Sequence, residues 1–155
     1  MYLKSYFVCK NLIFVAKMNN FNPEEITKFL EINPEVSENS LTWKLYDSET
    51  KNFLFLSVYS NLKFKGSENN LVSVQTNFGY FELHNFNLLF FLEPNEIVFV
   101  HHDSEKINCM IVGKNCTCSL YSNIDRNLVR SNIAELEPAF LLSALQLALL
   151  EDILP

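Results

Sequence analysis

With 155 residues, 48% of them hydrophobic and only three of them glycine, this chain is long enough to bury a sizeable core within one domain. Loops that bind phosphate groups need several glycines close together, so the scarcity of glycine argues against dinucleotide-binding and P-loop proteins. The net charge of −6 comes from residues 81–155, which hold four Lys or Arg and ten Asp or Glu, and an acidic half repels nucleic acids.

Residues 1–17 are apolar but are interrupted by Lys4, Lys10 and Lys17. They lack the continuous apolar stretch and the cleavage site of a secretory signal, and no other segment is long enough to span a bilayer. We interpret them as an upstream extension, since Met18 is an alternative start, or as an arm that adds a strand. A chain of this size needs no disulfide framework, so the four cysteines indicate reduced thiols and a cytoplasmic location.

An N-terminal helix is predicted within residues 18–35, with its regular part from about Pro23 to Leu30. Asn22 suits the N-cap and Pro23 suits the first helical position, because its missing N–H is not needed there. An Asn-Pro pair a few residues later predicts the end of the helix.

Residues 41–121 are predicted to form an antiparallel meander of about six to eight strands. Apolar and polar side chains alternate in LTWKLYD, and short turns separate the apolar runs that follow. The expected strands are residues 41–47, 52–59, 71–76, 78–86, 87–92, 97–102, 107–112 and 116–121. The runs 78–86 and 87–92 are compatible with one bent strand or with two.

The last hairpins allow a prediction of register. A four-residue loop at 103–106 would pair His102 with Ile107 and Val100 with Cys109. One face would then collect the apolar residues Val98, Val100, Ile107, Cys109 and Ile111.

Two registers are open for the turn that follows residue 113. A loop of three residues would place Thr117, Ser119 and Tyr121 on that apolar face. A loop of two residues, Lys114-Asn115, would instead place Cys116, Cys118 and Leu120 there. Because burial favours apolar side chains, we predict the shorter loop, which gathers three cysteines on one face.

Residues 125–155 are predicted to be helical, with a short helix at 125–132 and a long one from Glu137 to Leu154. Only two residues between 139 and 150 are polar, whereas a surface helix normally keeps a polar face. We therefore expect one face of the long helix to pack on the domain and another to meet a second chain. The residues assigned to this interaction are Phe140, Leu141, Leu145 and Leu149.

Taken together, these elements predict one α+β domain over residues 1–155. The expected architecture is an antiparallel meander with the N-terminal helix and the long hydrophobic C-terminal helix packed on one face.

Cys116 and Cys118 form the sharpest local pattern, and with Cys109 and a histidine they could bind zinc. Structural zinc sites separate their cysteines by two to four residues, however, and buried cysteines pack as small apolar side chains. We therefore expect core packing and no metal. Redox or regulatory use of these thiols is the other alternative.

The histidines give no catalytic pattern. His101 and His102 are adjacent in a strand and point to opposite faces, and His84 is isolated. The common nucleophile and zinc-protease motifs are missing. We therefore predict no catalytic residues and no cofactor, and we do not expect an enzyme.

The Phe-rich stretch 78–91 places aromatic residues on both faces of its strands. Core packing explains this most simply, and a ligand cavity or a subunit interface are the alternatives. A cavity would be lined by Phe78, Tyr80, Phe81 and Phe90.

The sequence thus favours a small non-catalytic protein-interaction module, such as an adaptor, assembly factor or chaperone-like regulator. It would bind itself as a homodimer, or another protein, through the apolar C-terminal helix. The alternative is a β-cup that binds a small hydrophobic molecule. Nucleic acid is not an expected partner, because Lys63 and Lys65 beside Phe64 are only two cations in a neutral half-chain.

Overall fold

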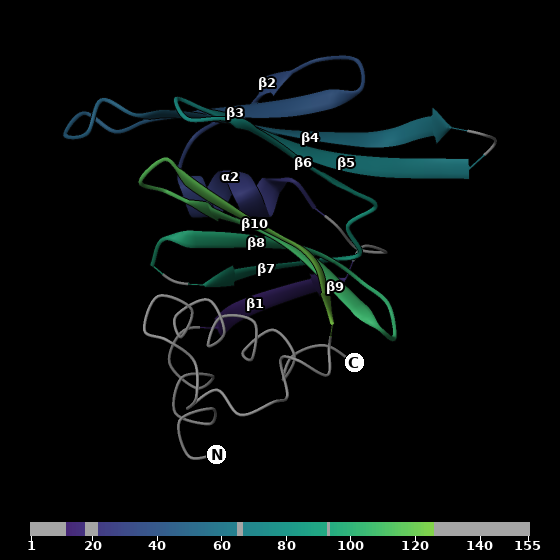
Figure 1. Ribbon diagram of the computed structural model, residues 1–155. Coiled ribbons are helices and arrows are strands. Elements are labelled where there is room, and N and C mark those ends of the chain that lie inside the picture. The colour runs from purple at the N-terminus through teal and green to yellow at the C-terminus, as the bar shows by residue number, and fades with distance from the viewer. Residues whose placement is uncertain (1–11, 18–21, 65–66, 93, 126–155) are drawn as a thin grey trace, which may run out of the picture.

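The structure, a computed structural model, describes residues 12–17, 22–64, 67–92 and 94–125. These residues form two antiparallel sheets with one helix between them (Figure 1). The strands of sheet A are β1 (Leu12–Lys17), β7 (Leu88–Leu92), β8 (Glu96–His102), β9 (Lys106–Gly113) and β10 (Thr117–Asp125). Those of sheet B are β2 (Glu35–Val36), β3 (Ser40–Tyr46), β4 (Phe53–Phe64), β5 (Ser67–Thr76) and β6 (Tyr80–His84), and the helix is α2 (Glu24–Leu30).

Strands that follow one another along the chain pair within each sheet, except that β1 pairs with β7. Sheet A has the order β1-β7-β8-β9-β10, and sheet B has the order β2-β3-β4-β5-β6. The predicted strands are present, and the stretch from 78 to 92 forms two strands that belong to different sheets. Residues 12–17 form β1, which pairs with β7 at the edge of sheet A.

Helix α2 begins as the sequence predicts. The Asn22 side chain accepts a hydrogen bond from the backbone N–H of Glu24 at 3.0 Å, which satisfies one of the free donors of the first turn. The helix ends at Glu31, whose left-handed conformation lets its N–H bond the carbonyl of Thr27 at 2.8 Å. The buried residues of the helix, Ile26 and Leu30, face the core.

The main core lies between the two sheets and includes the buried face of α2 (Figure 1). Trp43 is fully buried there, and its indole N–H donates to the Thr27 hydroxyl at 3.1 Å. On the other side of the helix, the Phe29 ring lies 4.9 Å from that of Phe91. Sheet B therefore contacts one side of the helix and sheet A the other.

Sheet A is apolar on both faces. Leu89, Phe91 and Phe99 belong to the core between the sheets, whereas Phe90 and Val98 point away from it and form a second buried cluster. The other buried members of this second cluster are Leu88, Val100, Ile107, Cys109 and Ile111. Burial on both faces explains why these strands have nearly continuous apolar sequences rather than an alternating pattern.

The predicted α+β fold is wrong. The described residues are mostly β, in two sheets rather than one meander, and α2, with seven residues, is the only helix among them. The predicted helices at 125–132 and 137–154 lie outside the described residues, apart from residue 125, which ends β10.

The sequence pattern missed the point where the chain leaves sheet B for sheet A. Asn85 adopts a left-handed conformation with φ of 55°, and its N–H bonds the Asn70 carbonyl at 2.9 Å. The Asn87 side chain then donates to the carbonyl of His102 at 2.9 Å and accepts from its N–H at 3.1 Å. Asn tolerates left-handed backbone, so two asparagines make this corner without the Gly or Pro that usually marks one.

The register prediction is confirmed for the hairpin β8–β9, where His102 pairs with Ile107 and Val100 with Cys109. It is wrong for β9–β10, because Thr117 pairs with Gly113 and Tyr121 with Cys109 across a three-residue loop. Cys116 takes the left-handed position of that loop, with φ of 63°. Since both faces of sheet A are apolar, burial did not discriminate between the registers.

Within the ranges above, no helix has the length and apolar character needed to cross a bilayer.

Candidate functional site

The outward surface of sheet B is the candidate site, and we call it the aromatic face. Strands β3 to β6 alternate buried and more exposed positions, because one side of the sheet packs on the core. In Figure 1, α2 and sheet A lie on the other side of this sheet. Two rings on the aromatic face are largely exposed, Tyr46 at 65% and Tyr80 at 57%.

Strand register arranges the aromatic face in rows that run across the sheet. One row of small hydroxyl residues, Thr42, Ser57 and Ser73, leads to Glu82. The row on one side of it contains Lys44, Phe55, Gln75 and Tyr80, and the row on the other side contains Tyr59, Leu71 and His84. Short polar side chains thus lie between two rows of larger, partly aromatic ones.

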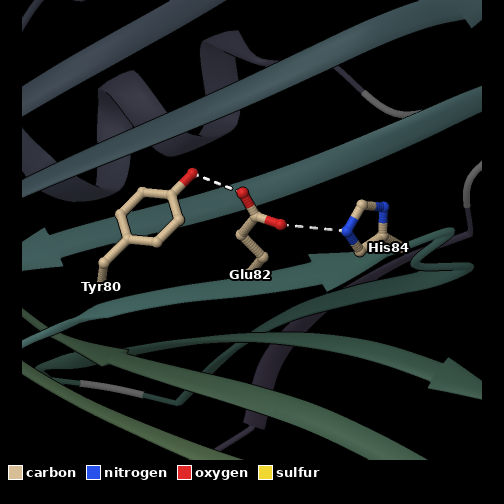
Figure 2. A network of polar contacts seen from close by, with 3 residues as sticks. All are labelled: Tyr80, Glu82 and His84. Atoms are coloured by element: carbon tan, nitrogen blue, oxygen red, sulfur yellow. Dashed lines mark hydrogen bonds and ion pairs between the residues drawn. The ribbon is translucent and has the colours of Figure 1, made fainter.

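Three side chains of β6 form a hydrogen-bonded network at the edge of this face (Figure 2). Residues 80, 82 and 84 share a face because side chains alternate along a strand. The Tyr80 hydroxyl donates to Oε1 of Glu82 at 2.6 Å, and Nε2 of His84 lies 3.1 Å from Oε2 of Glu82. A carboxylate only accepts, so Nε2 of His84 carries the proton in this contact.

Hydrogen bonding between Tyr80 and Glu82 shifts their pKa values in opposite directions. The hydrogen bond from Tyr80, and then that from His84, lower the pKa of Glu82, so this carboxyl is ionised. The same bond to Glu82, followed by burial, raises the pKa of Tyr80, so the phenol keeps the proton that it donates. Glu82 is therefore an oriented carboxylate with one lone pair of each oxygen already engaged.

Lys44, a second charged residue of the aromatic face, is also paired. Nζ of Lys44 lies 2.8 Å from a carboxylate oxygen of Glu35, and it lies 5.6 Å from the centroid of the Phe55 ring. Phe55 in turn contacts Phe53, with ring centroids 5.0 Å apart. Beside its rings, the face therefore presents one ion pair, Lys44 with Glu35, and one carboxylate, Glu82, that is held by hydrogen bonds.

The residues of the predicted cavity are not brought together. Phe78 is 82% exposed in the turn before β6, and Tyr80 lies on the aromatic face. Phe81 packs against the core between the sheets, whereas Phe90 is buried in the second cluster on the far side of sheet A. Of the four residues, only Tyr80 belongs to the candidate site.

The predicted interaction residues Phe140, Leu141, Leu145 and Leu149 lie outside the described residues.

The three described cysteines do not share a face, contrary to the prediction. Cys109 belongs to the second cluster of sheet A, whereas Cys116 and Cys118 contact the core between the sheets. Burial raises the pKa of the Cys109 and Cys118 thiols to about 12, which keeps them protonated. Across the described ranges, no three His, Cys, Asp or Glu side chains are grouped as metal ligands would be.

His101 and His102 have structural contacts at the corner between the sheets. Nδ1 of His101 lies 2.6 Å from the Asn85 carbonyl, so it acts as the donor there, and the backbone of His102 bonds the Asn87 side chain. His84 is the histidine that belongs to the candidate site, and its sequence position alone did not indicate its neighbours.

The sequence did not indicate the aromatic face as a candidate binding surface. The face is formed by the more polar positions of strands with an alternating pattern, such as Thr42, Lys44 and Tyr46 in LTWKLYD. Alternation shows only that these positions share one side of a strand. The pairing of β3 with β4, β5 and β6 is what brings these positions into one surface.

No protein family, no curated protein and no solved structure was found to match this chain.

Proposed function

We propose that this protein is a non-catalytic binding module that contacts its partner through the aromatic face of sheet B. The observation that supports this most is the exposure of Tyr46 and Tyr80 on a regular sheet surface, where Tyr80 also bonds the ordered Glu82 carboxylate. Exposed aromatic side chains next to oriented polar groups are typical of binding surfaces. A sheet also holds such groups more rigidly than a loop does.

A binding role suits the chemistry of the network better than catalysis does. Each oxygen of Glu82 already accepts one hydrogen bond, from Tyr80 or from His84, and all three groups lie on an exposed strand rather than in a pocket that excludes water. We propose a cytoplasmic location for this module, and the free cysteines among the described residues favour a reducing compartment.

The test is a screen of small fragments by ¹H–¹⁵N NMR, with a library that includes aromatic, sugar-like and amino-acid-like compounds. We expect the hits to shift the amide signals of Ser57, Ser73 and Glu82. A double variant, Tyr46→Ala with Tyr80→Ala, should lose most hits, whereas the control Glu105→Gln in the β8–β9 loop should keep them. Hits that gather on other surfaces, or no hits at all, would contradict the proposal.

The apolar pattern of residues 137–154 favours a second proposal, which is association with a second copy or with another protein. Phe140, Leu141, Leu145 and Leu149 would make that contact. Native mass spectrometry of Leu145→Asp, with Gln146→Glu as the matched control, tests it. A smaller assembly for Leu145→Asp alone is the expected result, and unchanged masses for both variants would remove this proposal.

A further inference from the structure

We propose that the aromatic face binds uncharged, hydroxyl-rich oligosaccharides. This inference rests on the proposed function and names the class of ligand for the same surface. It is carried by three features of the face: its exposed rings, its hydroxyl and carboxylate groups, and the pairing of its charges.

The first feature is the position of the rings. Tyr46 and Tyr80 are more than half exposed and lie on two neighbouring rows of the face. A pyranose ring has one or two faces made only of C–H groups, and such faces pack on the flat side of an aromatic ring. Rings that lie apart on an open sheet therefore suit an extended chain of sugars better than a single compact molecule, which needs a concave pocket.

The second feature is the polar row beside Tyr80. Ser73 pairs with Glu82 in this row but is only 5% exposed, and Thr42 and Ser57 hydrogen-bond one another at 2.8 Å farther along the row. The exposed polar group of the row beside Tyr80 is therefore the Glu82 carboxylate. Glu82 has lone pairs left after its bonds to Tyr80 and His84, since each carboxylate oxygen accepts two. Adjacent hydroxyls of a sugar are donors with the spacing that the two oxygens of one carboxylate can accept.

The third feature is charge. Glu35 neutralises Lys44, and His84 and Tyr80 both donate to Glu82, so an ionic partner would have to compete with contacts that already exist. The net charge of −6 repels anionic polymers in addition. An uncharged ligand with many hydroxyls neither has to displace these charge contacts nor is repelled by the net charge.

A protein partner fits this face less well. The centres of protein–protein interfaces are depleted of Ser, Lys and Glu. On the aromatic face, Lys44 pairs with Phe55, and Ser57 lies between Phe55 and Tyr59 on β4. We therefore treat peptide binding as an outcome of the test and not as part of the proposal.

The test uses the full chain on an array of neutral hexasaccharides of glucose in α and β linkage, mannose, xylose and N-acetylglucosamine. The array also carries oligogalacturonate as an anionic glycan and a set of unmodified peptides. We expect binding to at least one neutral glycan and to neither of the other classes. Binding to oligogalacturonate or to peptides in preference, or to no neutral glycan, would overturn the proposal.

Isothermal titration of the bound glycan with variants then locates the site. We expect Tyr80→Ala to weaken binding by about tenfold through lost packing on the ring. Glu82→Gln should also weaken it by about tenfold or more, since a hydrogen bond to an ionised group is lost. Tyr80→Phe keeps the ring and should lose less than Tyr80→Ala, and Glu105→Gln should bind as the parent protein does.

Amide NMR spectra of each variant show whether it is folded. If folded Tyr80→Ala binds the glycan with the same dissociation constant as the parent protein, the proposal is overturned. The glycan array tests the class of ligand, and the fragment screen tests the proposed function. Fragments on the aromatic face without any glycan binding would refute the ligand class and leave the proposed function standing. Absence of both would refute both.

Discussion

Glu96 is a half-buried carboxyl at the start of β8, and burial raises its pKa. The folded protein therefore releases this proton less readily than the unfolded chain does. Below the unfolded pKa of about 4.3, both states are protonated and the group has no effect on stability. As pH rises above that value the free energy of unfolding falls, and the loss is complete above the folded pKa.

We therefore predict that Glu96→Gln raises the melting temperature at pH 7 and has no effect near pH 3. Thermal unfolding followed by circular dichroism across this range is the measurement. Glu105→Gln serves as the control, because Glu105 is exposed in a loop. A gain at pH 3 as large as that at pH 7 would show that the cause is not ionisation.

At the scale of single elements, the hydrogen bond from Trp43 to Thr27 joins sheet B to helix α2. Trp43 is fully buried, so its N–H loses its partner without access to water if the Thr27 hydroxyl is removed. Thr27→Val keeps the shape of the side chain and should lower the free energy of unfolding by about 1–3 kcal/mol.

Chemical denaturation followed by fluorescence measures this loss, and the only tryptophan of the chain provides the signal. Thr27→Ser retains the hydroxyl and should be clearly more stable than Thr27→Val. If the two variants unfold at the same denaturant concentration, the hydrogen bond does not hold the helix in place.

Much of the local structure could be predicted from the sequence, because local signals encode it. Helix α2 has its cap at Asn22, and the alternation in β3 identifies a strand with one buried side. The division into two sheets could not be predicted in this way. It depends on long-range pairing and on a corner made by Asn85 and Asn87, whose side-chain and backbone contacts with distant residues leave no local pattern.

The same limit applies to the candidate site. The sequence predicts a cavity that includes Tyr80, but Phe78 is exposed, Phe81 packs against the core between the sheets and Phe90 is buried in the second cluster. Periodicity along one strand shows which residues share a side. Periodicity does not show whether that side meets solvent or a second layer of the protein. Because both faces of sheet A are buried, no polar side reveals the register of its strands.

At the scale of the whole molecule, the two sheets differ in their outward surfaces. The outward side of sheet A holds Phe90, Val98 and Ile107, each at most 1% exposed. The outward side of sheet B holds Tyr46 and Tyr80, each more than half exposed. The binding proposals for the aromatic face depend on this difference, because a ligand needs a surface that water also reaches.

A soluble gadolinium chelate measures this difference directly, since it broadens the NMR signals of protons that solvent reaches. We expect strong broadening for the ring protons of Tyr46 and Tyr80. We expect little broadening for the methyl groups of Val98 and Ile107. Methyl signals of sheet A broadened as strongly as the tyrosine rings, or tyrosine rings protected from the chelate, would contradict the account.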